Sequence, residues 1–153
     1  MTEVAPTPAA EEVVGPAQGI YNVLVAATSF NLPNDSWTFS YGRLVSSPDQ
    51  QLVVLGTGGK DPEIAVAVDY PTVQLICRGA AASGQYAQAR GVLVAAKEAL
   101  LGIPSAPTAW PELTLCSVRG DIQDLGYDSS NRPMFSLNLQ LIVSYDQSGY
   151  RTL

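Results

Sequence analysis

The stretch YPTVQLICRGAAASGQYAQARGVLVAAKEALLG, residues 70–102, contains the change of hydrophobic period that decides the fold. In its first part, Val73, Leu75 and Cys77 alternate with residues that point the other way, of which the last is Arg78. Alternation with a period of two is the pattern of a strand with one buried face. The segment therefore predicts a strand that ends at a charged residue.

The second part of the stretch changes to helical spacing after the small residues 79–84. The apolar positions that recur every three or four residues are Tyr86, Ala89, Leu93, Ala96 and Leu100. This period predicts a helix from about Ser83 to Leu101, with Ser83 as the N-cap and Gly102 as the stop. A strand followed by a long amphipathic helix is therefore expected, and the turn 79–84 lacks the paired glycines of a dinucleotide site.

Other segments carry strand patterns of differing strength. The alternation is cleanest over 135–145, which predicts a long central strand with every second residue on one side, and a further strand is expected in 112–126 before a turn at 126–133. Shorter strands are expected in 36–44, 50–55 and 64–68, with a flexible loop over 56–62. The strand residues predicted to share a side are Trp37, Phe39 and Tyr41, and then Phe135, Leu137, Leu139, Leu141, Val143 and Tyr145.

A first helix is expected before these strands. Ile20, Val23, Leu24 and Ala27 have helical spacing, and residues 31–33 end the pattern. We place its start near residues 8–12, with a kink or break at Gly15-Pro16. The order of elements predicts an α+β fold: a mainly antiparallel sheet with this N-terminal helix and the second long helix packed on one face. We expect a flexible arm over 1–10, one domain over 11–147 and a tail over 148–153.

Composition narrows the classes of function. The 153 residues carry a formal charge of -6 and only 14% charged residues. A net negative charge repels nucleic-acid backbones and anionic membranes, so we expect no specific nucleic-acid binding. No apolar run approaches about 20 residues and the N-terminus is acidic, so we predict neither a membrane span nor a signal peptide. The modest charge is consistent with surface that neighbouring subunits cover.

Candidate catalytic and metal-binding groups are few. The absence of histidine removes the commonest general base and metal ligand, and we expect no cofactor. Cys77 and Cys116 each lie in an apolar run, which favours buried thiols, with a disulfide between strands as the alternative. Asp121 and Asp124 provide the two carboxylates for the least favoured alternative, a small hydrolase. Loop carboxylates are more often solvated surface than a site.

Three arginines are candidates for contacts between subunits. Arg78, Arg119 and Arg132 lie at strand ends or in turns, where a surface arginine in an ion pair is the plain interpretation. Arginine also forms bidentate pairs with carboxylates and is enriched in interfaces. We therefore predict an oligomer interface that includes Arg78, Arg119, Asp121 and Arg132. Arg78 is the strongest candidate, because the small residues after it leave its side chain room to reach outward.

Three segments together resemble the bacteriophage tail terminator or minor capsid protein family of long-tailed phages. They are YPTVQLICRG at 70–79, YAQARGVLVAAKEALLG at 86–102 and DLGYDSSNRPMFSLNLQLIV at 124–143. The shared features are an N-terminal helix, a Pro-x-x-Gln-x-x-x-Arg strand before an amphipathic helix, and an Asn-Arg turn leading into the last strand. The resemblance extends from about residue 10 to residue 145.

The resemblance implies a noncatalytic structural protein of the virion, in the tail or neck, that is assembled in the host cytoplasm. It implies a ring, typically a hexamer, that sits at the head-proximal end of the tail tube, stops its growth and joins it to head-completion proteins. The implied partners are further copies of the chain, the tail tube protein and a head-completion or stopper protein, while DNA passes through the lumen without specific binding. The alternative within the same machine is that the chain is itself another head-tail connector, a head-completion or stopper protein.

Overall fold

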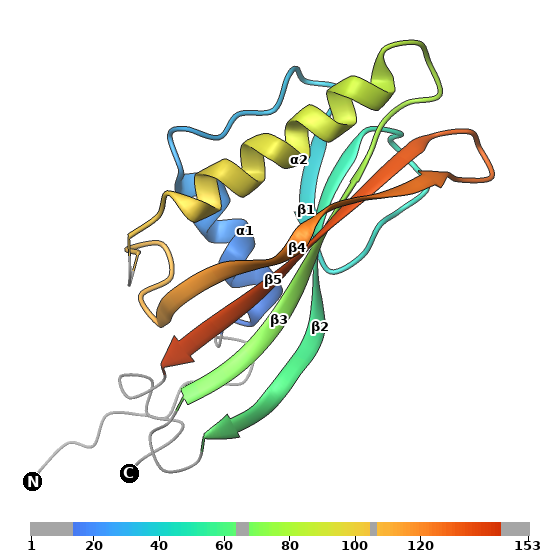
Figure 1. Cartoon of the computed structure of the whole chain (residues 1–153). Coiled ribbons are helices and arrows are strands. Elements are labelled where there is room, and N and C mark those ends of the chain that lie inside the picture. Colours follow the sequence, from blue (N-terminus) through green and yellow to red (C-terminus); the bar gives the residue numbers. More distant parts are fainter. Residues whose placement is uncertain (1–13, 64–67, 105–106, 145–153) are drawn as a thin grey trace, which may run out of the picture.

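The computed structural model describes residues 14–63, 68–104 and 107–144, which form one sheet covered on one face by two helices (Figure 1). In chain order the elements are α1 (Pro16–Ala26), β1 (Thr38–Tyr41), β2 (Gln51–Glu63), β3 (Val68–Arg78), α2 (Gln85–Leu101), β4 (Leu113–Tyr127) and β5 (Pro133–Ser144). The strand order is β1-β2-β3-β5-β4, and all neighbours are antiparallel except β1 and β2. The predicted α+β fold is confirmed. The expected domain boundaries lie outside the described residues.

The core lies between the two helices and the sheet, and the alternating strands β3 and β5 provide most of its floor. Their buried side chains are the ones the alternation predicts: Val73, Leu75, Cys77, Phe135, Leu137, Leu139, Leu141 and Val143. Each is at most 1% exposed. Both strands have neighbours on either side in the sheet, so β5 is interior, as predicted. Tyr145 lies outside the described residues.

Helix α1 begins later than the sequence pattern predicts. Val14 and Gly15 are not helical, and Pro16 occupies the first helical position, where its fixed φ and missing N–H are tolerated. Residues 8–12, where we expected the start, lie outside the described residues. The helix also ends at Ala26 rather than near residue 31, because the chain becomes extended at Ala27. Pro16 thus starts α1, and whatever the prediction places before Val14 lies outside the described residues.

Helix α2 ends as predicted but starts differently. Gly84, with a φ of 83°, is the residue before the helix, and no side chain caps the N-terminus, so the expected cap at Ser83 is wrong. Gly102 follows the last turn, and its N–H donates to the carbonyl of Glu98. Tyr86 is 42% exposed: its ring packs on the core residue Phe135, with centroids 4.9 Å apart, while its hydroxyl reaches the exposed Asp124 on β4.

Strand β2 includes the segment 56–62, for which we predicted a loop. Antiparallel pairing with β3 keeps these residues extended, and the register shifts at bulges between Gly56 and Gly59 and between Lys60 and Glu63. At Gly59 a Cβ would overlap the backbone of Tyr70, so the close approach of the two strands requires glycine there. The strand expected over 64–68 is described only from Val68, the first residue of β3.

The connection between the parallel strands β1 and β2 crosses the sheet face opposite the helices, which we call the open face. Parallel neighbours need such a crossover, because the chain must return to the end where the first strand began. Cys77 faces α2, where its thiol donates to the carbonyl of Ala89, so the next residue, Arg78, faces the other way. The crossover loop 42–50 binds Arg78 and therefore covers one end of the open face.

The two cysteines are free thiols, so the disulfide alternative is wrong. Cys77 lies on β3 and Cys116 on β4, and β5 separates these strands. Burial raises the pKa of the Cys77 thiol above its usual range and raises that of Cys116 to about 12. Both side chains therefore act as small apolar groups.

Candidate functional site

Arg78 is buried, with 3% of its surface exposed, and its guanidinium holds the loop 42–50. Its Nε donates to the carbonyl of Asp49 at 2.8 Å, and one terminal nitrogen donates to the carbonyls of Val45 at 2.7 Å and Pro48 at 2.9 Å. The side chain therefore turns back onto its own subunit, and our expectation that it reaches outward is wrong. The loop covers Arg78 because the connection between the parallel strands β1 and β2 crosses this face.

Arg132 lies at the same end of the sheet and joins the loop 42–50 to the turn between β4 and β5. Its Nε donates to Asp128 Oδ2 at 2.8 Å, and Nη1 donates to Asp49 Oδ1 at 3.0 Å and to the carbonyl of Ser46 at 2.8 Å. The Arg132 side chain is only 11% exposed. Charge-assisted hydrogen bonds in such a setting are stronger than those of an exposed ion pair.

Arg78, Arg132, Asp49 and Asp128 form what we call the arginine cluster, in which two positive and two negative groups balance. Burial lowers the pKa of Arg78, and the positive charge of Arg132 lowers it further. Partial burial raises the pKa of Asp128, but hydrogen bonds from the Arg132 backbone and guanidinium outweigh it, so this pKa lies below its usual range. The cluster therefore fixes the loop 42–50 between two arginines, Arg78 on β3 and Arg132 beside the turn that carries Asp128.

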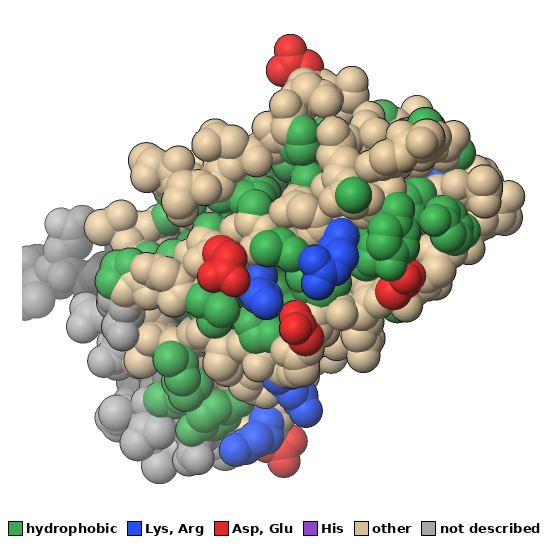
Figure 2. Space-filling model, turned by 45° about the horizontal axis from the view of Figure 1, so that its top comes forward, with side chains coloured by type: hydrophobic (Ala, Val, Ile, Leu, Met, Phe, Trp, Pro, Cys, Tyr) green, Lys and Arg blue, Asp and Glu red, His purple; other side chains and the backbone are tan. Residues whose placement is uncertain are grey.

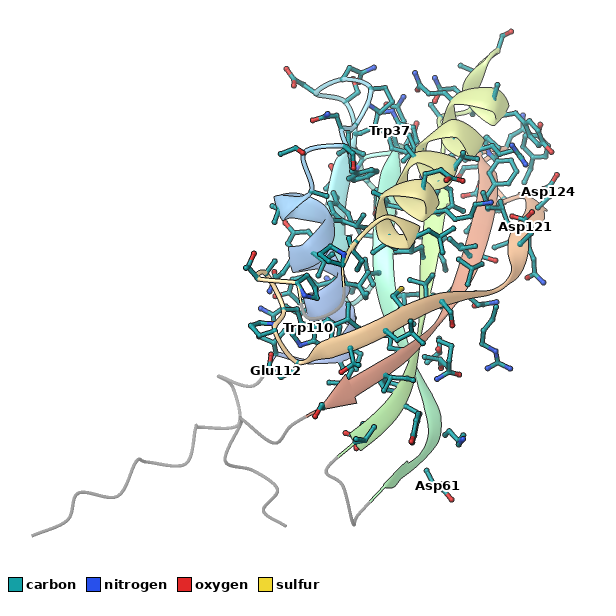
Figure 3. All side chains as sticks on the ribbon, turned by 60° about the vertical axis from the view of Figure 1, so that its left-hand side comes forward. Trp37, Asp61, Trp110, Glu112, Asp121 and Asp124 are labelled. Carbon is teal, nitrogen blue, oxygen red and sulfur yellow. The ribbon has the colours of Figure 1, made fainter. Side chains whose placement is uncertain are left out.

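Asp121 and Asp124 lie close together on β4, at the side of the molecule away from α1 (Figure 3). Asp121, whose side chain is 74% exposed, accepts from the Ile122 backbone N–H at 2.7 Å and from Lys97 Nζ at 3.3 Å. These hydrogen bonds lower the pKa of Asp121. The contact with Lys97 joins the edge strand β4 to α2.

Asp124 makes a second contact between β4 and α2. The Tyr86 hydroxyl donates to Asp124 Oδ2 at 2.7 Å, and the Gly126 backbone N–H donates to Oδ1 at 2.8 Å. The hydrogen bond with Tyr86, followed by the one from Gly126, lowers the pKa of Asp124. A carboxyl group that acts as a general acid needs a raised pKa. The geometry of the two carboxylates therefore favours structural contacts over the hydrolase alternative.

Arg119 is exposed and lies apart from the arginine cluster, on the uncovered part of the open face. It lines a shallow hollow of about 450 Å³ with Thr57, Thr72, Gly120 and Asn138. The hydroxyls of Thr57 and Thr72 are hydrogen-bonded at 2.7 Å. The hollow is polar, and Arg119 provides its charge.

The four residues predicted for an oligomer interface thus occupy three places. Arg78 and Arg132 meet in the arginine cluster, Arg119 lies on the open face, and Asp121 lies against α2. Their contact with another subunit stays a prediction. Sequence reasoning missed Asp49 and the loop carbonyls as partners of the arginines, because a crossover loop carries no periodic signal that ties it to a strand.

Other kinds of site find little support in the part of the chain that the structure describes. Within the ranges 14–63, 68–104 and 107–144, no three His, Cys, Asp or Glu residues lie together in a way that would hold a metal ion. None of the described helices has the length and apolar character needed to cross a membrane.

The fold and its charged contacts define an α+β structural unit whose polar groups mainly hold strands, loop and helix together. The chain belongs to the bacteriophage tail terminator protein family, whose family model matches residues 19–145. No curated protein matches the chain. The family is one of structural proteins, so the protein is a component of the phage tail that associates with other proteins of the tail or head.

Proposed function

We propose that the protein forms a closed ring, typically of six copies, at the head-proximal end of the tail tube in the neck of the virion. The ring stops growth of the tube and joins it to the head-completion or stopper protein, after assembly in the host cytoplasm. The observation that carries this proposal is the family match over residues 19–145, which includes all five strands, α2 and most of α1.

The surface of the chain supports a role in assembly. Among the described strands, β1 and β4 are the two edges of the sheet, and exposed charged groups lie on the open face at Arg119 and beside α2 at Asp121. We assign these two side chains to contacts between subunits. Arg78 and Arg132 act on the interface indirectly, because they hold the loop 42–50 in place.

The negative charge of the chain suits a passage for DNA. Each copy carries a formal charge of -6, so a ring repels the phosphate backbone and lets DNA move through the lumen without binding a specific sequence. No cofactor enters this function.

Two alternatives fit less well. We expect a head-completion or stopper protein to be a smaller barrel without a long second helix, whereas this sheet is open and α2 has 17 residues. The hydrolase alternative rests on Asp121 and Asp124, whose hydrogen bonds lower both pKa values.

The experiment that tests the proposal combines particle mass with tail length. Mass photometry of the purified protein, alone and with tail tubes, should show a closed oligomer, and phage lacking the protein should produce tubes of uncontrolled length. Monomers at every concentration, with and without tubes, would contradict the ring. Tubes of normal length without the protein would contradict the role in stopping growth.

A further inference from the structure

Large hydrophobic side chains that are exposed in the described residues gather on the two edges of the molecule. Five belong to β4 or to the side of α2 next to it, and two belong to α1 and β1. The first group is Tyr86, Leu101, Leu115, Leu125 and Tyr127, and the second is Val25 and Tyr41. Single exposed apolar residues are ordinary, but their confinement to the two sheet edges requires an explanation.

The β4 flank consists of these five hydrophobic residues together with Arg90, Lys97, Asp121 and Asp124. Its two basic and two acidic residues give it a formal charge of zero. Lys97 of α2 binds Asp121, and Tyr86 of α2 binds Asp124. These contacts hold both acidic side chains of the flank against α2. Figure 2 shows hydrophobic side chains beside intermixed basic and acidic ones on the face that includes the helix layer.

The β1 flank consists of Val25, Tyr21, Phe39, Tyr41 and Arg43. Tyr21 and Val25 are four residues apart on α1 and therefore lie on the same side of the helix. The Tyr21 ring packs on Phe39 and Tyr41, with centroids 4.6 Å and 5.1 Å away. The result is a short aromatic and aliphatic strip beside β1, followed by the exposed Arg43.

We propose that the β4 flank of one copy packs against the β1 flank of the next copy. This inference rests on the proposed ring, because a closed ring needs two different patches that meet head to tail. The strand order puts β1 and β4 at the two ends of the sheet, so the two flanks lie on opposite sides of the described part of the chain. Each flank supplies apolar surface that the other can bury.

The contact uses side chains rather than a continuous sheet across subunits. Strand β4 is interrupted by register shifts between Leu113 and Leu115, between Arg119 and Gln123 and between Asp124 and Gly126. Bulges of this kind disturb the edge for pairing with another strand. Strand β1 has four residues, too few to pair along the whole of β4.

Charge favours a second copy of the chain as the occupant. Two chains of charge -6 repel each other, but the β4 flank is neutral and the β1 flank carries the single positive charge of Arg43. The net negative charge of each copy therefore lies outside the two flanks. A contact between a neutral flank and a flank of charge +1 adds no repulsion of its own.

The test uses two double variants that each add two carboxylates to one flank. Leu101→Glu/Leu125→Glu alters the β4 flank, and Val25→Glu/Tyr41→Glu alters the β1 flank. The matched control, Ala87→Glu/Ser129→Glu, adds the same charge at exposed positions on the outer side of α2 and in the turn between β4 and β5. Thermal melts monitored by circular dichroism establish that all three variants fold. Mass photometry then measures the number of copies in each oligomer.

Each flank variant should be monomeric alone, because every contact in the ring needs both flanks. An equimolar mixture of the two variants should give dimers and nothing larger, since only one intact pair of flanks remains. The control should assemble as the wild type does.

Several results would overturn the inference. If both flank variants assemble normally while the wild type forms rings, the ring uses other surfaces and the proposed function stands. If the mixture stays monomeric, if the β1-flank variant alone still dimerises, or if the control also dissociates, the pairing of these flanks is wrong. A wild type that never assembles contradicts both the inference and the proposed ring.

Discussion

Arg78 and Arg119 show how the same residue type takes different roles according to what covers it. Arg78 lies under the crossover loop, and three backbone carbonyls accept its hydrogen bonds. Arg119 lies on the uncovered part of the same sheet face, in a shallow polar hollow. The difference comes from the loop, because alternation along the strands puts both side chains on the open face.

Replacing Arg78 by alanine should therefore lower stability more than replacing Arg119. The Arg78→Ala change removes three hydrogen bonds from a buried side chain, although Gln51 Nε2 still donates to the carbonyls of Val45 and Pro48, and we expect it to cost about 2–4 kcal/mol. Arg119→Ala should cost less than about 0.5 kcal/mol. Urea unfolding of both variants measures the difference, and equal midpoints would show that the loop does not depend on Arg78.

Asp128 should make stability depend on acid pH. Its pKa in the folded protein lies below the ordinary value of about 3.9, so the ionised carboxylate stabilises the fold above that pH. This contribution is lost as the pH falls through the folded-state pKa. Asp128→Asn should lower stability at pH 7 and flatten the decline in melting temperature below about pH 4. Asp61→Asn, an exposed carboxylate at the other end of the sheet, is the control. A wild-type and an Asp128→Asn profile that run parallel would contradict this role.

Gly19 in α1 and Gly91 in α2 lie in opposite surroundings. Gly19 lies on the buried side of α1 against the ring of Trp110, where an added Cβ would overlap the indole. Gly91 lies on the exposed side of α2 with open space around it. Glycine is needed at the first position for space, and at the second it only lowers helix propensity.

Alanine at these two positions should have opposite effects. Gly19→Ala should destabilise the protein by about 1–3 kcal/mol, because the buried Trp110 must move. Gly91→Ala should stabilise it by about 0.5–1 kcal/mol through higher helix propensity. Thermal melts of the two variants check the prediction. Stabilisation by Gly19→Ala would mean that α1 does not pack on Trp110 in solution.

Strand β5 provides a similar contrast between adjacent residues. Leu139 is fully buried in the core, and Asn138 faces the open side beside Arg119. Leu139→Asp should cost at least about 4 kcal/mol, since a carboxylate would be buried without a partner. Asn138→Asp should cost far less. Chemical denaturation compares them, and similar stabilities would mean that the two faces of β5 are assigned the wrong way round.

Periodic segments were predictable from sequence, and segments governed by distant partners were not. The alternation around Leu75 and Leu139 identifies the buried faces of β3 and β5, because burial of one side imposes a period of two. The glycine-rich segment 56–62 has no such pattern and is extended because β3 pairs with it. The preference of serine for N-cap positions likewise predicts Ser83 as the N-cap of α2, whereas Gly84 occupies that position in the structure.

The candidate site was predictable in composition but only partly in geometry. The sequence identifies Arg78 and Arg132 as unusual residues at strand ends, yet it cannot show that a loop more than 25 residues before Arg78 supplies the acceptors. The contacts of Asp121 and Asp124 with α2 also depend on tertiary structure, since they join residues far apart in the chain. The role of a side chain that binds a crossover loop can be assigned only when the strand order and the path of the loop are known.

At the scale of the whole molecule, charge is distributed unevenly. The chain has a formal charge of -6, but the β4 flank is neutral and the arginine cluster is balanced. Two associating copies therefore repel each other through charges that lie outside the proposed contact surface.

Added salt should consequently favour assembly. Raising the ionic strength from about 0.01 M to about 0.15 M shortens the screening length from about 30 Å to about 8 Å, which weakens repulsion between copies and leaves apolar contacts intact. The fraction of protein in the oligomer, measured by mass photometry at fixed concentration, should rise. A fall would indicate that attraction between opposite charges dominates the contact.

The placement of the arginine cluster at one end of the sheet gives any assembly joined by the flanks a polarity. Its two rims would differ. One would carry the loop 42–50 and the turn after β4, joined by Arg132, together with the start of α2, which Gln50 of the loop contacts. The other would carry the far strand ends near Asp61 and Glu112 (Figure 3). A tube and a head-completion protein would thus meet chemically different surfaces, so a ring of identical copies has a direction without any further component.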